Sequence, residues 1–190
     1  MCIRDRYDNL NQFTHFVNDI IIPQYGKPEE VMIIEVDHIF RKDQIEKSIK
    51  EFRSRKLQCA TTRQIEIWKG FKHRVPERIN RCGVNFWNLR NLEKMPKTLR
   101  QGNIRNMHKL STFVYNLGFA VSERTMYWKH LTALAYSKKI KDLVPNEDWY
   151  ENKWLNWNED NNYDLEISKG KEYLIPKVVP YNFEKELLEL

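Results

Sequence analysis

The sequence predicts an α/β fold, with a mixed sheet flanked by helices and an irregular C-terminal tail. In the first half of the chain, helical spacing alternates with short β-branched runs in the order helix, strand, helix, strand, which is typical of α/β architectures. The chain has 190 residues, of which 41 % are hydrophobic and 13 % aromatic. This is enough for one packed domain, and it excludes intrinsic disorder, a class poor in both kinds of residue.

The first two elements are predicted to be a helix and a buried strand. Apolar residues at helical spacing predict a helix that ends at Pro23. The stripe consists of Leu10, Phe13, Val17, Ile20 and Ile21. Residues 31–36 begin with four consecutive apolar residues. Such a run predicts a central strand buried on both faces, here between the helices around Phe16 and Ile49.

The following elements are predicted from the same signals. Ile45, Ile49 and Phe52 mark a second helix, and the β-branched segment 57–68 predicts a strand. Shorter strands are expected at 83–89 and 113–115. Ser122 is a good N-cap for a helix reaching about Lys139, with Glu123 in its first turn. We expect residues 158–190 to form an extended tail, which its prolines keep out of helix.

Charge and cysteine content narrow the class of protein. The chain has 32 Lys and Arg against 26 Asp and Glu, a net charge of +6, which suits a phosphate-bearing partner. No apolar run approaches the ~20 residues of a membrane span, so we expect a soluble protein. The three cysteines lack zinc-site spacing and favour a reduced, cytoplasmic location.

Two acids at the end of the predicted strand 31–36 form the main candidate site. Glu35 and Asp37 are two residues apart, so on a strand their side chains share a face. Ligands of open α/β sheets bind beyond the carboxyl ends of strands, and paired carboxylates there suit a divalent cation. His38 adds a possible ligand. In the alternative interpretation, the acids only mark where the strand leaves the core, and Asp37 caps the next helix.

These residues resemble the middle of a GT-A-type glycosyltransferase, particularly the family-2-like enzymes. Glu35-Val36-Asp37-His38-Ile39-Phe40 resembles the family's acidic Asp-x-Asp-type motif. Asn116-Leu117-Gly118-Phe119, followed by Ser122-Glu123-Arg124 and Lys129, resembles its later motif and helix. The likeness covers residues 7–157 and is strongest to uncharacterised glycosyltransferase-like proteins of bacteriophage. The chain departs from the family at Glu35, His38 and Asn116, where Asp, Glu and His are common.

The resemblance implies a fold, a reaction and a set of site residues. The fold is part of the GT-A, nucleotide-diphospho-sugar transferase-like sheet, and the reaction moves a sugar from a nucleotide-diphosphate donor to an acceptor hydroxyl. A divalent metal, Mn or Mg, is held by Glu35, Asp37 and Asn116, with Asp37 essential for turnover. The residues implied in donor binding are Glu35, His38, Arg78 and Lys129.

Glu66 is the candidate general base that deprotonates the acceptor hydroxyl. Its neighbour Lys69 also suggests a metal nuclease, but on a strand the two side chains point to opposite faces. A solvated strand charge is the remaining interpretation. The arginines at 74–81 and the basic residues at 100–109 can clasp a donor diphosphate or a nucleic-acid backbone, or form solvated surface. The tryptophans clustered within residues 128–157 either pack in the core or stack on sugars or bases.

Two further expectations concern alternative functions of the protein and the boundaries of its natural chain. The alternatives are a phage-encoded nucleic-acid-binding protein that uses the basic loops and aromatics, and an inactive glycosyltransferase relative. Residues 1–6 resemble translated sequencing-adapter DNA, so we expect a non-native start and further strands upstream in the natural protein. If the protein is phage-encoded, its location is the host cytoplasm.

Overall fold

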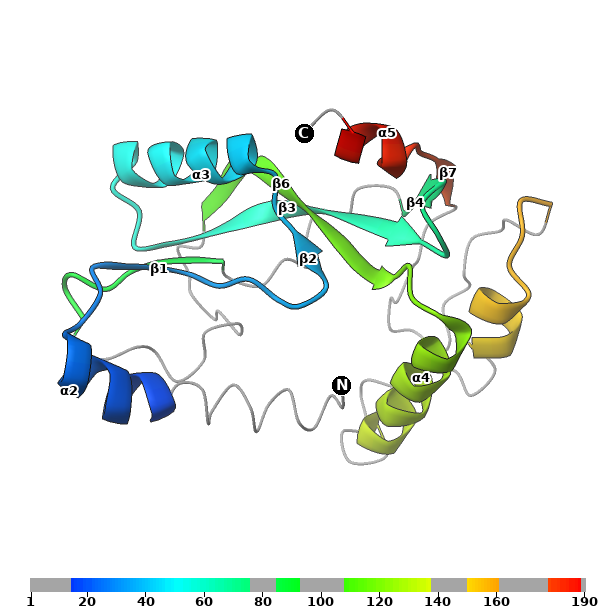
Figure 1. The fold of residues 1–190 in the computed structure, drawn as a ribbon, viewed down its shortest axis with the longest axis horizontal. Coiled ribbons are helices and arrows are strands. Elements are labelled where there is room, and N and C mark those ends of the chain that lie inside the picture. Colours follow the sequence, from blue (N-terminus) through cyan, green and yellow to red (C-terminus); the bar gives the residue numbers. More distant parts are fainter. Residues whose placement is uncertain (1–14, 76–84, 93–107, 138–149, 161–177, 189–190) are drawn as a thin grey trace. The chain divides into compact units, whose positions relative to one another are not determined.

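The computed structural model describes residues 15–75, 85–92, 108–137, 150–160 and 178–188 (Figure 1). The chain divides into two compact units. The first unit consists of Tyr7–Gln64 and Arg78–Tyr115, and the second of Met1–Arg6, Ile65–Glu77 and Asn116–Leu190. Two long strands, β3 (Cys59–Trp68) and β6 (His108–Phe119), contribute residues to both units.

The sheet of the first unit is built from short strands beside β3. Strand β1 (Glu30–Met32) pairs antiparallel with β5 (Phe86–Asn88), and β5 pairs antiparallel with β3. Strand β6 pairs with β3 and with β2 (His38–Ile39). The chain therefore combines helices and sheet as predicted, although the pairs that hold β1 are antiparallel.

Helices cover both faces of this sheet. Neighbouring residues of a strand point to opposite faces, so each strand contributes side chains to both packed layers. On one face, Cys59 and Trp87 pack with Val17 from the helical segment η1 (Val17–Ile21). On the other, Ala60 and Phe86 pack with Phe52 from α3 (Lys42–Ser54). Figure 1 shows α3 and α2 (Ile22–Tyr25) on opposite sides of the strands, as predicted for the two flanking helices.

The prediction of a central strand over residues 31–36 is wrong in length and position. Strand β1 ends at Met32 and lies at the end of the strand order β1-β5-β3. The backbone amide of Ile33 still donates to the carbonyl of Asn85, at 2.7 Å, and the chain then leaves the sheet. Ile34 and Val36 are 54 % and 90 % exposed, so the apolar run does not continue into the core.

The predicted end of the first helix at Pro23 is also wrong. Helix continues through Pro23 to Tyr25, and Gly26, at φ 84°, ends it. Proline is tolerated in the first turn of a helix, where its missing amide is not needed. The sequence rule failed because the π-helical segment η1 ends at Ile21 and a new α-helical turn starts at Ile22.

Most other predicted elements are confirmed, with changed boundaries. Helix α3 and strand β3 match the predictions closely, and β5 lies within 83–89. Strand β6 has 12 residues instead of the three predicted, since it begins at exposed polar residues before Phe113 and continues beyond Tyr115 to Phe119. Helix α4 (Glu123–Ser137) begins where predicted, and the Ser122 hydroxyl accepts a hydrogen bond from the Thr125 amide at 3.3 Å.

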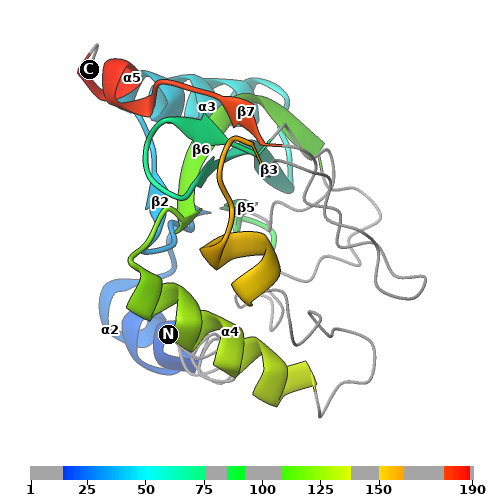
Figure 2. The same cartoon turned by 90° about the vertical axis from the view of Figure 1, so that its right-hand side faces the viewer.

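The second unit has an aromatic core around the end of β3. Trp68 packs with Val75, Met126 and Val178, together with residues of η2 (Tyr150–Leu155). A turn at Lys69 and Gly70, both with positive φ, connects β3 to β4 (His73–Arg74). Strand β4 pairs antiparallel with β7 (Val179–Pro180), which Figure 2 shows beside it.

The prediction that residues 158–190 are extended and free of helix is wrong at the end of the chain. Helix α5 (Phe183–Leu188) follows β7, and its Phe183 is fully buried against Phe71. The Asn182 side chain accepts a hydrogen bond from the Lys185 amide at 3.0 Å, which makes Asn182 the N-cap of this helix. Residues 161–177 lie outside the described part. No helix in the described part has the length and apolar character needed to cross a membrane.

Candidate functional site

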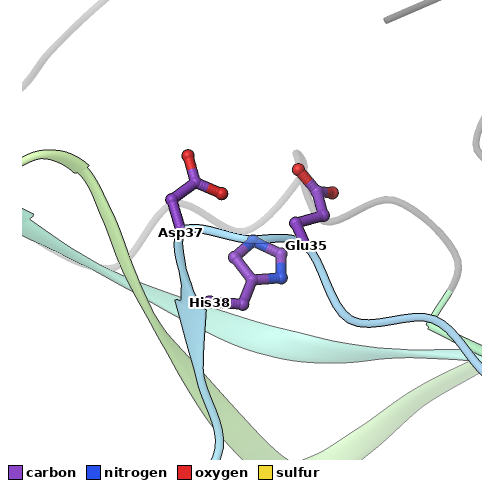
Figure 3. Close-up of side chains that lie close together, drawn as sticks. All are labelled: Glu35, Asp37 and His38. Carbon is purple, nitrogen blue, oxygen red and sulfur yellow. The ribbon is translucent and has the colours of Figure 1, made fainter. Parts of the chain in front are cut away.

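The loop between β1 and β2 gathers three potential metal ligands. Glu35, Asp37 and His38 each offer one ligand atom, and these atoms all lie within 4.8 Å of one another. Figure 3 shows the two carboxylates on either side of the imidazole ring. All three residues are half-buried and belong to the first unit. The sequence predicted the two acids as ligands and His38 as a donor-binding residue, and the structure brings the three together.

A turn, and not the continuation of a strand, produces this arrangement. The His38 amide donates to the carbonyl of Glu35 at 3.0 Å, so the chain reverses across Val36 and Asp37. Val36 consequently points into solvent while the acidic side chains on either side of it converge. Asp37 does not cap α3, since the N-cap position of that helix is Arg41. The alternative in which Asp37 serves as a helix cap is therefore wrong.

The imidazole of His38 is held from two directions. Its Nε2 lies 3.3 Å from the side-chain amide nitrogen of Gln64 on β3. Its ring also meets Phe40 edge-on, with centroids 6.4 Å apart. These contacts fix the orientation of the ring. Metal ligation would also require the oxygen of the Gln64 amide, and not its nitrogen, to face Nε2, so that Nε2–H donates to it and Nδ1 keeps its lone pair for the cation. Gln64 was not singled out in the sequence, because nothing there connects position 64 with position 38.

The chemistry of these three groups suits a divalent cation. Two carboxylates in close proximity repel each other unless water or a cation offsets the charge. Oxygen ligands alone would suit magnesium or calcium, whereas an added imidazole nitrogen also suits manganese or zinc. The donor set therefore fits the Mn or Mg expected from sequence, with the imidazole favouring Mn.

The remaining candidate site residues do not belong to this group of three. Glu66, Asn116 and Lys129 belong to the second unit, and Arg78 lies outside the described residues. The Asn116 side chain accepts a hydrogen bond from the Gly118 amide at 2.6 Å, and Lys129 donates to the Gly118 carbonyl at 2.9 Å. Both residues therefore support the end of β6. Their roles at the metal and the donor, and that of Glu66 as a base, stay predictions.

Lys69 has a structural role that the sequence did not reveal. Its ammonium group donates to the carbonyls of Leu155 and Trp157, at 2.6 and 3.1 Å, and lies over the Trp154 ring. Burial lowers its pKa, which nearby Glu123 partly counteracts. These contacts are those of a cation binding the carboxyl end of a helix, here η2.

Only part of the basic and aromatic surface predicted for a phosphate-bearing partner can be located. Arg74 lies over the ring of Tyr181, 5.3 Å from its centroid, which is a packing role. The other arginines of the two basic stretches lie outside the described residues. Trp154 is buried in the core, as predicted for most tryptophans, whereas Trp128 on α4 is 57 % exposed.

Comparisons with known proteins add no family assignment. No family model, curated protein or solved structure matches the chain.

Proposed function

We propose that the chain is a GT-A-type glycosyltransferase whose Glu35, Asp37 and His38 bind a divalent cation. The observation that carries this proposal is the convergence of the three side chains, with ligand atoms within 4.8 Å of one another. The resemblance of residues 35–40 to the acidic motif of that family supplies the reaction. The substrate is a nucleotide-diphosphate sugar, and the acceptor carries a hydroxyl group.

Each site residue has a definite task in this proposal. Glu35 and Asp37 provide oxygen ligands, and His38 provides Nδ1 when its Nε2–H donates to the side-chain oxygen of Gln64. The bound cation would neutralise negative charge on the departing nucleotide diphosphate. Glu66 as general base, Asn116 as a metal ligand and Arg78 and Lys129 in donor binding are roles that the family resemblance implies, and the cation site proposed here does not depend on them.

The first experiment measures cation binding and turnover separately. We expect Mn²⁺ to bind the purified protein in calorimetry and to raise its melting temperature. A ligand at a hundred times its Kd stabilises the folded state by about 2.7 kcal/mol. Asp37→Ala should lose this binding while keeping the fold, because no core volume is removed. Glu46→Ala is the matched control, since Glu46 is an exposed acid of α3 outside the cluster.

Transfer or hydrolysis of nucleotide sugars, with and without Mn²⁺ or Mg²⁺, then tests the reaction. Metal-dependent turnover that disappears in Asp37→Ala supports the proposal. Cation binding without turnover of any donor supports an inactive relative and refutes the enzyme. Metal-independent, salt-sensitive binding to nucleic acid, with no cation binding at all, would support the nucleic-acid alternative.

A further inference from the structure

Helix α3 makes hydrogen bonds to the backbone of β6 in addition to packing on the sheet. The Glu51 carboxylate accepts from the Ser111 amide at 2.8 Å and from the Ser111 hydroxyl at 2.7 Å. Arg55 forms an ion pair with Glu51 at 2.8 Å and donates to the carbonyl of Lys109 at 3.1 Å. A strand's backbone groups are thus bonded to side chains where a neighbouring strand would otherwise bond.

The same face of α3 reaches β6 one turn and two turns earlier. The Gln44 side chain accepts from the Phe113 amide at a longer 3.4 Å. Ser48 and Thr112, both fully buried, join their hydroxyl groups at 2.6 Å. The four helix positions 44, 48, 51 and 55 are spaced by three or four residues, so they form one stripe.

The backbone groups bound by this stripe belong to one edge of β6. They are the carbonyl of residue 109 and the amides of residues 111 and 113, which alternate along the strand. Alternate residues direct their backbone groups to the same edge. Over this segment, α3 therefore takes the place that a further strand would occupy.

The covered segment has the composition of a self-associating strand. Residues 110–115 read Leu-Ser-Thr-Phe-Val-Tyr, without charge, proline or glycine. Six-residue segments with high β-propensity and no charge are the usual signature of strands that pair with copies of themselves. An antiparallel pair centred on Ser111 would set residue 109 of one copy opposite residue 113 of the other. The exposed backbone groups of the two edges would then satisfy each other by two-fold symmetry.

We propose that α3 covers an interaction edge of β6, and that this edge pairs with the same edge of a second copy when the Glu51 contacts are lost. The apolar packing of Phe52 against Leu110 anchors the helix to the face of the sheet, whereas Glu51 and Arg55 close the edge. Charged side chains and covering helices are common means of protecting such edges. The proposal is independent of the cation site.

Glu51→Ala tests this proposal through association and hydrogen exchange. We expect the variant to form a dimer in light scattering at concentrations where the unmodified protein is monomeric. In the monomeric fraction, the Ser111 amide should exchange roughly ten- to a hundred-fold faster, the range expected on removing a hydrogen bond to a charged group. A peptide copy of residues 109–115 should bind the variant and not the unmodified protein.

Two further variants keep the test decisive. Adding Ser111→Pro to Glu51→Ala removes the edge amide, so this double variant should remain monomeric. Glu46→Ala, on the same helix and outside the stripe, should behave as the unmodified protein. If Glu51→Ala does not fold, Arg55→Ala removes the milder contact and should show the same association more weakly. If Glu51→Ala and Arg55→Ala both remain monomeric, the proposal is overturned, whatever the exchange rate of the Ser111 amide.

Discussion

The first unit uses its acidic side chains in two contrasting ways. Glu51 is engaged by Ser111 and Arg55, and its contacts hold α3 to the edge of β6. Glu35 and Asp37 instead converge on each other and on His38 in a turn whose neighbouring apolar residues are exposed. The first arrangement satisfies a charge with donors from the fold itself. The second places two carboxylates and an imidazole within reach of one cation, which is why we propose it as a binding site.

The largest expected effect comes from removing the packing beneath the Glu51 contacts. Phe52 is almost fully buried against Phe86 and Leu110, so Phe52→Ala should lower the free energy of unfolding by about 3–5 kcal/mol. Ile34→Ala, at an exposed position of the loop between β1 and β2, should change the free energy of unfolding by less than about 0.5 kcal/mol. Denaturant unfolding of both variants measures the difference. Equal losses would mean that the loop is as much part of the core as α3.

An intermediate effect on folding stability is expected when Glu51 is protonated at low pH. Partial burial alone would raise the pKa of Glu51, but the hydrogen bonds from Ser111 and the ion pair with Arg55 outweigh it and hold the pKa below its usual 4.5. The folded state therefore binds fewer protons than the unfolded state. The stability from this group is complete above pH 4.5 and is lost as the pH falls through the lower folded value.

Unfolding at a series of pH values, compared with Glu51→Gln, measures this contribution. The variant should be less stable near neutral pH and should lose less stability on acidification below pH 4.5. Parallel curves for the two proteins would show that the Glu51 contacts do not contribute to stability.

The smallest effect on stability is expected from substitutions of Asp37 and His38 in the loop between β1 and β2. Without metal, Asp37→Asn should change the free energy of unfolding by about 0.5 kcal/mol or less. His38→Gln should lower it by about 1 kcal/mol, because the imidazole also loses its contacts with Gln64 and Phe40. With Mn²⁺, both should lose the stabilisation seen in the unmodified protein. Thermal melts with and without Mn²⁺ provide the measurement, and a large metal-free loss in either variant would assign the loop to the fold.

The sequence by itself determined the elements whose side chains follow a regular period. The spacing of Ile45, Ile49 and Phe52 was sufficient for α3, and the β-branched run was sufficient for β3. Ser122 marked the start of α4 because a helix cap is a local interaction. Glu35 and Asp37 were also recognisable from sequence, since two acids directly after an apolar run are conspicuous.

Only the tertiary structure decided where β1 ends and which residues surround its acids. An apolar run carries no information about which strands pair with it. The antiparallel pairing of β1 with β5, and the position of β1 at the end of the strand order, therefore could not be predicted. The contacts of Gln64 with His38 and of Glu51 with Ser111 join residues 26 and 60 positions apart. Such contacts depend on the packing of elements distant in sequence, and local periodicity carries no information about them.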